Sequence, residues 1–374
     1  MSNETTYLMI PGPVDAEDDV LEAMAHQVLP HYGRPWLEIY NQALDGLRQI
    51  FGTMGDVFMM TGPGTAGLEA ALGSLAYSGE KVLVAQNGFF GQRLGTVARA
   101  YGLDVHVVEA PLDEPIDPQI IARRLAAEPE IQAVVVVHLE TSTGVLNPVQ
   151  EIAAITGEAD VPIIVDAVSS LGGVPLRVDD WGLDVCVSVI NKCLGCPPGI
   201  APISVSERAW AQIERKGGRN HGWYLDLGVW KQYARDWGDW HPYPTSMPTN
   251  NVLALLASLR RILAQGLEAQ YERHARAAAR VRQALTGWGF RSFAPEAHSS
   301  PLITAVYGPP GLDVEDLRRY LLEEWQIMIS GGLNELRGKI VRVGHIGKAA
   351  SDEYVQHLLD GIEAYLRLSP PRAG

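Results

Sequence analysis

The sequence is poor in cysteine. Cys186, Cys193 and Cys196 are the only three among 374 residues, and an odd number clustered in one short stretch excludes a disulfide framework. Cys193 and Cys196 form a CxxC pair, but a structural zinc needs two further thiolate or imidazole ligands, and none lies at a suitable spacing. We therefore expect no metal site.

Basic residues and long apolar runs are also scarce. Thirty Lys and Arg stand against 44 Asp and Glu, a net charge of −14, and an acidic surface repels nucleic acid and anionic lipid. The longest apolar stretches, such as Ala133 to Val137, are far shorter than the roughly 20 residues of a membrane span. The N-terminal residues lack the basic start and apolar region of a signal peptide. We expect a cytoplasmic protein without nucleic-acid or membrane partners.

What the sequence does have is the pattern of an α/β protein. A hydrophobic share of 47% is globular, and 374 residues predict two domains, or one large domain with an appendage. Between about residues 55 and 210, short apolar runs alternate with amphipathic stretches, which predicts a mostly parallel central sheet with helices on both faces. The predicted strands are Val57 to Met60, Lys81 to Ala85, Val105 to Val108, Ala133 to Val137, Val161 to Val165 and Val185 to Val189.

The C-terminal part has a different pattern. A helical period runs from Asn251 to Leu285, too long for an ordinary surface helix unless it bridges two domains. We place the boundary within it, with a large domain at 21–265 and a small α+β domain at 266–374. Its predicted strands are Leu302 to Val306, Gln326 to Ile329 and Lys339 to Val343, and its helices are Val314 to Trp325 and Asp352 to Leu366.

An aromatic-rich segment at 216–248 shows no regular period. It contains Trp223, Trp230, Trp237 and Trp240, interrupted by Gly and Pro. Long irregular segments are usually functional or buried at a subunit contact. The segment is therefore either a satellite core or an oligomer interface.

A glycine-rich loop follows the first predicted strand. Gly62, Gly64 and Gly67 match the GxGxxG spacing and open a helix, so backbone N–H groups there could cradle an anion. Dinucleotide binding also requires an acidic residue after the next strand, where this chain has Gln86 and Asn87. The loop thus fits a single phosphate, with the Thr65 hydroxyl as a further donor, or simply makes a tight turn.

Polar side chains follow three other predicted strands. His138, Glu140 and Thr141 come after one strand, Asp166 after another, and Asn191 and Lys192 after a third. Because the carboxyl ends of parallel strands line one crevice, these groups should converge with the glycine-rich loop.

Asp166 and Lys192 are each costly to bury as unpaired charges. They could pair with each other, or a cofactor could hold both. Pyridoxal phosphate (PLP) has the required groups, since its ring nitrogen suits a carboxylate and its aldehyde carbon reacts with an amine.

Two further positions could contact such a cofactor or its substrate. Phe89 or Phe90 could stack on a planar ring, or either could pack in the core. Arg342 lies inside an apolar strand and needs an anion, which could be a substrate carboxylate or a structural partner such as Glu335. No Ser-His-Asp order, HExxH or P-loop motif is present.

Four stretches resemble the alanine–glyoxylate and serine–glyoxylate (serine–pyruvate) aminotransferases of the class V, fold type I group. They are His138-Leu-Glu-Thr-Ser-Thr-Gly144, Asp166-Ala-Val-Ser-Ser-Leu-Gly-Gly173, Asn191-Lys192-Cys-Leu-Gly-Cys-Pro-Pro-Gly199 and Lys339-Ile-Val-Arg342-Val-Gly-His-Ile-Gly347. The similarity extends from Pro11 to the last predicted helix. It implies an N-terminal active-site segment at 1–20 and a PLP-binding large domain.

The resemblance implies roles around the cofactor ring. Lys192 would bond to the aldehyde carbon and move the proton between the amino acid Cα and the cofactor C4′. Asp166 would hold the ring nitrogen, and Val168 would pack under the ring. Phe90 would stack where the family often has Trp, and Thr141 would contact the ring hydroxyl side.

It also implies the phosphate and substrate contacts. Gly64 and Thr65 would bind the phosphate, whereas Asn191 stands where the family often has a Gln that reaches it, so that this contact is shortened or lost.

Tyr243 and Ser246 or Thr245 would be donated to the phosphate by the neighbouring subunit of a homodimer with shared active sites. Arg342 would bind the substrate α-carboxylate, with the Gly12 backbone nearby.

The implied function is a ping-pong transaminase that moves the amino group of alanine or serine to glyoxylate or pyruvate. The segment from His31 to Pro35 departs from the family pattern near the substrate, which leaves the donor open. Local similarity to pyridoxamine–pyruvate aminotransferase, which uses the free vitamin, gives one alternative, and a non-catalytic PLP-fold binding protein gives another. A cysteine desulfurase is excluded, because it needs a nucleophilic Cys in the C-terminal half and none follows Cys196.

Overall fold

The structure is a computed structural model that describes residues 6–217 and 222–368. Residues 1–5 of the predicted N-terminal segment, 218–221 of the aromatic-rich segment and 369–374 of the predicted small domain lie outside the described residues. Within the described ranges, no helix combines the length and the apolar character that crossing a membrane requires.

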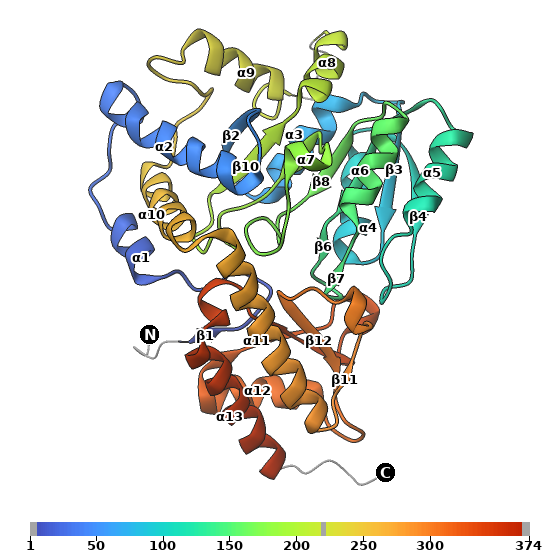
Figure 1. Cartoon of the computed structure of the whole chain (residues 1–374), viewed down its shortest axis with the longest axis vertical. Helices are drawn as coiled ribbons and strands as arrows, with labels where there is room; N and C mark the ends of the chain where they lie inside the picture. The colour runs from blue at the N-terminus through green and yellow to red at the C-terminus, as the bar shows by residue number, and fades with distance from the viewer. Residues whose placement is uncertain (1–5, 218–221, 369–374) are drawn as a thin grey trace.

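A mixed sheet of seven strands lies at the centre of the large domain in the described part of the chain (Figure 1). Its strands, in spatial order, are β2 (Asp56–Thr61), β10 (Ile200–Val205), β9 (Val185–Val187), β8 (Ile163–Asp166), β5 (Ile131–Val137), β3 (Lys81–Gln86) and β4 (Asp104–Glu109). All neighbours pair in parallel except β10, which is antiparallel to both β2 and β9. The predicted, mostly parallel sheet is confirmed.

Helices flank this sheet, so β8 and β10 are buried along their whole length. The helices of this part are α1 (Asp18–Met24), α2 (Arg34–Phe51), α3 (Gly64–Leu75), α4 (Phe89–Ala100), α5 (Pro118–Ala127), α6 (Val149–Glu158), α7 (Val178–Trp181), α8 (Glu207–Arg215), α9 (Leu227–Asp236) and α10 (Thr249–Gln265). A short hairpin of β6 (Leu139–Glu140) and β7 (Val145–Leu146) follows β5.

The predicted long bridging helix is interrupted. Helix α10 ends at Gln265 and α11 (Leu267–Gly287) begins directly after Gly266, which has a φ of 86°. A side chain is strained at such a positive φ, so glycine permits the change of direction. Helix α11 then runs away from the large domain along the small one (Figure 1).

The small domain contains a four-stranded antiparallel sheet in the described residues, covered by helices. Its strands, in spatial order, are β11 (Arg291–Ser292), β12 (Ile303–Tyr307), β15 (Ile340–Gly344) and β14 (Ser330–Gly331), and its other helices are α12 (Val314–Trp325) and α13 (Asp352–Leu368). Near the N-terminus, β1 (Tyr7–Leu8) pairs in parallel with β13 (Ile327–Met328). Met9 is therefore buried in the core of the small domain, and the chain enters the large domain from there.

The sequence predicts an aromatic-rich segment without regular structure. That prediction is wrong in part, because the segment contains helix α9. Trp230 of this helix is fully buried in the core of the large domain. Trp223, Trp237 and Trp240 are about half exposed, at 56%, 47% and 47%. One side of the segment thus packs inward, and its other side presents aromatic rings to solvent.

Candidate active site

Of the two charges predicted to be costly, Asp166 is buried and Lys192 is partly buried, and they are not paired with each other. Asp166 is the last residue of β8, and one of its carboxylate oxygens accepts a hydrogen bond from the Val168 N–H at 2.9 Å. Lys192, in the turn between β9 and β10, donates from Nζ to the carbonyl of Pro11. Among the described residues no ion pair within 4.0 Å joins Asp166 to Lys192. The alternative of a direct salt bridge is therefore not realised.

Burial disfavours the charged form of each group. It raises the pKa of Asp166 to about 6 and lowers the pKa of Lys192 to about 8. A lysine with a lowered pKa is a competent amine nucleophile near neutral pH. A ligand with a protonated ring nitrogen would stabilise the carboxylate of Asp166.

The N-terminal segment closes over Lys192. Gly12 has a φ of 128°, and a Cβ there would lie 2.5 Å from Cδ and Cε of Lys192. Only glycine combines this backbone with so close an approach. Gly12 therefore lies directly beside Lys192, whereas its predicted place near a substrate carboxylate stays a prediction.

The predicted anion site lies at the N-terminus of α3. The helix begins at Gly64 after Pro63, and no side chain caps it. The N–H groups of its first turn have no partner within the helix, and together with the helix dipole they favour an anion. A Cβ on Gly64 would lie 2.7 Å from Val168 and 2.8 Å from Val189, so glycine lets this helix end approach the strand ends.

The small domain contributes Arg342, from β15. Its Nε donates to the Gly331 carbonyl at 2.8 Å, and its Nη1 donates to the Thr141 carbonyl at 2.7 Å. No carboxylate, Glu335 included, forms an ion pair with it within the described ranges. The structural partner that we considered for Arg342 is therefore wrong. Burial lowers the pKa of this guanidinium to about 10, and an anionic ligand would stabilise its charged form.

The family pattern described as aminotransferase class-V matches residues 7–348. The chain belongs to the class V aminotransferases. It is 36% identical over 351 residues to an uncharacterized aminotransferase of Methanocaldococcus jannaschii, covering 94% of this chain and 90% of that protein. It is 34% identical over 345 residues to the pyridoxamine–pyruvate transaminase of Mesorhizobium japonicum, with coverages of 92% and 87%. The crystal structure of an alanine–glyoxylate aminotransferase from Nostoc sp. superimposes with a TM-score of 0.93 at 32% identity, covering 98% and 97% of the two chains.

Class V aminotransferases are PLP-dependent, and the residues of this aminotransferase fit that cofactor. The uncapped start of α3 suits its phosphate, the buried Asp166 suits its ring nitrogen, and Lys192 suits its aldehyde carbon. Val168, whose N–H bonds to Asp166, is partly buried beside Gly64.

The other residues predicted to contact the phosphate differ in burial and in hydrogen bonding. The Tyr243 hydroxyl is buried, donates to the His31 carbonyl and accepts from Trp36 Nε1 at 2.6 Å. Its one O–H donor is thus used within this chain. Ser246 is exposed, and Asn191 and Thr245 are partly buried, so Ser246 is the most exposed of the three.

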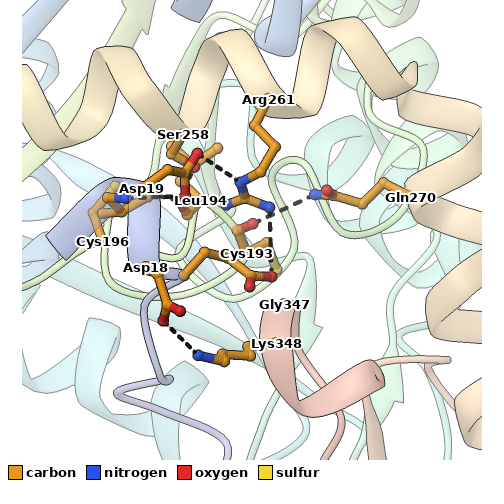
Figure 2. A network of polar contacts seen from close by, with 12 residues as sticks. Asp18, Asp19, Cys193, Leu194, Cys196, Ser258, Arg261, Gln270, Gly347 and Lys348 are labelled. Atoms are coloured by element: carbon orange, nitrogen blue, oxygen red, sulfur yellow. Dashed lines mark hydrogen bonds and ion pairs between the residues drawn. The ribbon is translucent and has the colours of Figure 1, made fainter. Parts of the chain in front are cut away.

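A network of polar contacts surrounds the turn that follows Lys192, at Cys193 and Leu194 (Figure 2). Gln270 of α11 donates to the carbonyls of Gly172 and Cys193, at 2.6 and 3.4 Å, and Ser258 of α10 donates to the Leu194 carbonyl. The loop that holds Lys192 is thus tied to both helices at the domain junction. Burial raises the pKa of the Cys193 thiol to about 12, which makes it a packing residue.

Sequence reasoning missed the contacts of two residues near the candidate site. Glu140 belongs to the predicted row of polar groups. Its hydrogen bond with the Phe90 N–H of α4 was not predicted, because the two residues are 50 positions apart in the chain. Arg93 was not singled out, although its guanidinium lies 5.0 and 5.2 Å from the ring centroids of Phe89 and Phe90. The only signal for Arg93 was its position one helical turn after those rings.

Proposed function

We propose that this aminotransferase moves the amino group of a small L-amino acid, alanine or serine, to glyoxylate or pyruvate by a ping-pong mechanism. One observation carries the proposal. A partly buried lysine, a buried carboxylate and a buried arginine lie near the same strand ends, and none of the three has an ionic partner in the described residues. Together they match a cofactor ring and a substrate carboxylate.

The chain's own groups would divide the work as follows. Arg342 would bind the α-carboxylate of the donor, with the Gly12 backbone beside it, and so orient the Cα hydrogen toward Lys192. Lys192 would move the proton between Cα and the cofactor C4′. Asp166 would keep a proton on the ring nitrogen. PLP supplies the electron sink that makes this proton transfer possible.

Other side chains would position the cofactor. Phe90 would stack on one face of the ring and Val168 would pack on the other, while Thr141 would lie at the ring hydroxyl side. Gly64 and Thr65 at the start of α3 would hold the phosphate, as would Ser246 of a second subunit. A small donor would suit a site that the N-terminal segment approaches as closely as Gly12 approaches Lys192.

The test is spectroscopic first and kinetic second. Purified protein mixed with PLP should show a visible absorption band that L-alanine or L-serine bleaches and glyoxylate restores. A panel of amino donors at fixed glyoxylate then ranks the donors. A band that no donor bleaches would favour the non-catalytic binding protein, and the absence of any band would refute the site itself.

One relative, the pyridoxamine–pyruvate transaminase, makes the use of the free vitamin a second candidate. The uncapped α3 N-terminus favours the phosphorylated cofactor here. Turnover of phosphate-free pyridoxamine with pyruvate, in protein stripped of PLP, would decide for the second candidate.

A further inference from the structure

Glu140 is a buried carboxylate to which the proposed reaction gives no task. Its side chain is fully inaccessible to solvent. One oxygen accepts the N–H groups of Phe90 and Gly91, at 3.0 and 3.1 Å. The other accepts the N–H and the hydroxyl of Ser142, at 3.0 and 2.5 Å. Since a carboxylate offers about four acceptor positions, all are in use, and none is left to take a proton from a substrate.

These hydrogen bonds cap the N-terminus of α4 with residues from a distant part of the chain. Helix α4 begins at Phe89 after Gly88, which supplies no side-chain cap. The Ser142 hydroxyl accepts the N–H of Phe89 at 3.0 Å, and Glu140 accepts the next two. A negative group here also complements the positive end of the helix.

Gly88 makes this approach possible. Its φ of 169° is extended backbone that any residue adopts, so the requirement is for space. A Cβ there would lie 2.5 Å from the carboxylate carbon of Glu140 and 2.6 Å from the Ser142 hydroxyl. Any side chain at position 88 would thus push the carboxylate away from α4.

The same turn also holds the substrate-binding arginine. The carbonyl of Thr141, the residue after Glu140, accepts the 2.7 Å bond from Arg342 Nη1. Because Glu140 bonds to the N–H of Ser142, its carboxylate fixes the turn on both sides of that carbonyl. Two consecutive residues therefore contact Phe90 in the large domain and Arg342 in the small one.

We propose that Glu140 is a positioning residue that fixes the ring-stacking Phe90 relative to the carboxylate-binding Arg342. The proposal rests on the roles proposed for Phe90 and Arg342. It predicts that loss of the carboxylate loosens the start of α4 before any cofactor binds, and that it lowers kcat by misaligning ring and substrate.

The first test uses Glu140→Gln, which keeps the shape but turns one acceptor oxygen into an N–H₂ donor facing N–H groups. Amide hydrogen exchange of the cofactor-free protein should be at least about tenfold faster at Phe90 and Gly91. Loss of a hydrogen bond to a charged acceptor changes the equilibrium for local opening by more than that factor. Exchange in β5 should be unchanged. Unchanged protection at Phe90 and Gly91 would overturn the proposal, whatever the substrates prove to be.

The second test displaces Glu140 without removing it, in case Glu140→Gln does not fold. Gly88→Ala should speed exchange at the same two amides, lower kcat with glyoxylate and alter the circular dichroism of the bound cofactor. Gly287→Ala is the matched control, because a Cβ there meets nothing within 4 Å. Equal kcat and equal dichroism for the two alanine variants would contradict a positioning role.

Discussion

Lys192 has an environment that favours the neutral amine. Its Nζ meets a backbone carbonyl, and burial brings its pKa from the ordinary 10.5 down to about 8. Only the neutral amine attacks an aldehyde, so covalent capture of PLP by the cofactor-free protein should accelerate as pH rises, with a midpoint near 8. Stopped-flow absorbance between about pH 6 and about pH 10, a range that brackets this value, measures the rate of capture. A midpoint at the ordinary lysine value would contradict the assigned environment.

Removal of the same side chain tests its task. Lys192→Ala should lower kcat by at least about 10²- to 10⁴-fold, the usual contribution of a positioned proton-transfer group. Steady-state assays with alanine and glyoxylate provide the measurement. A Lys192→Ala protein that still showed cofactor-dependent turnover near the wild-type rate would refute the role.

Arg342 has five N–H donors, of which carbonyls use two in the described structure. The others remain available for a carboxylate. Arg342→Lys cannot hold both carbonyls and also bind a carboxylate with two parallel bonds. The KM for the amino donor should rise about 10- to 100-fold, as expected for lost charge-assisted bonds. Binding of an amino compound without a carboxylate should be unaffected, and an unchanged KM for alanine would exclude this contact.

At the scale of elements, Gly266 separates two helices that a continuous apolar period would have joined. Its φ of 86° and ψ of 142° suit glycine alone. Gly266→Ala should therefore lower the free energy of unfolding by about 1–3 kcal/mol, as measured by urea denaturation. Gly287→Ala, at the end of α11, should leave stability unchanged or raise it slightly. Equal stabilities of both variants would show that the junction tolerates an unbroken helix.

At the scale of the whole molecule, Ser246 can test whether the proposed dimer shares its active sites. Ser246 is exposed in the single chain, as expected for a residue that serves a second subunit. Ser246→Asp would place a negative charge against the cofactor phosphate and inactivate that site. In a mixture with Lys192→Ala subunits, each hybrid dimer would contain one intact site.

The two inactive variants, unfolded and refolded together, should regain about a quarter of the wild-type activity, since half of the dimers are hybrids with one working site. Each variant refolded alone is the control. No regain in a mixture shown to contain hybrids would place Ser246 and Lys192 in the same subunit's site.

Most strands and several helices of this protein could be predicted from local sequence patterns. Buried Val and Ile runs predicted the strands because helices cover both faces of the sheet, and α12 has the predicted bounds. The prediction failed where one residue redirects the chain, as at Gly266, or where a helix such as α9 lacks a regular apolar period. Strand-end polar residues predicted the site because parallel strands bring their carboxyl ends together.

The sequence by itself determined which polar groups gather at the candidate site, because residues that follow neighbouring parallel strands share one edge of the sheet. Only the tertiary structure decided their partners. Asp166 and Lys192 remained apart, Arg342 met the Thr141 carbonyl, and Glu140 reached the start of α4. The contacts of Lys192, Arg342 and Glu140 join residues far apart in the chain, and hydrogen bonds are made within about 3 Å. No local pattern specifies a distance that small between two domains.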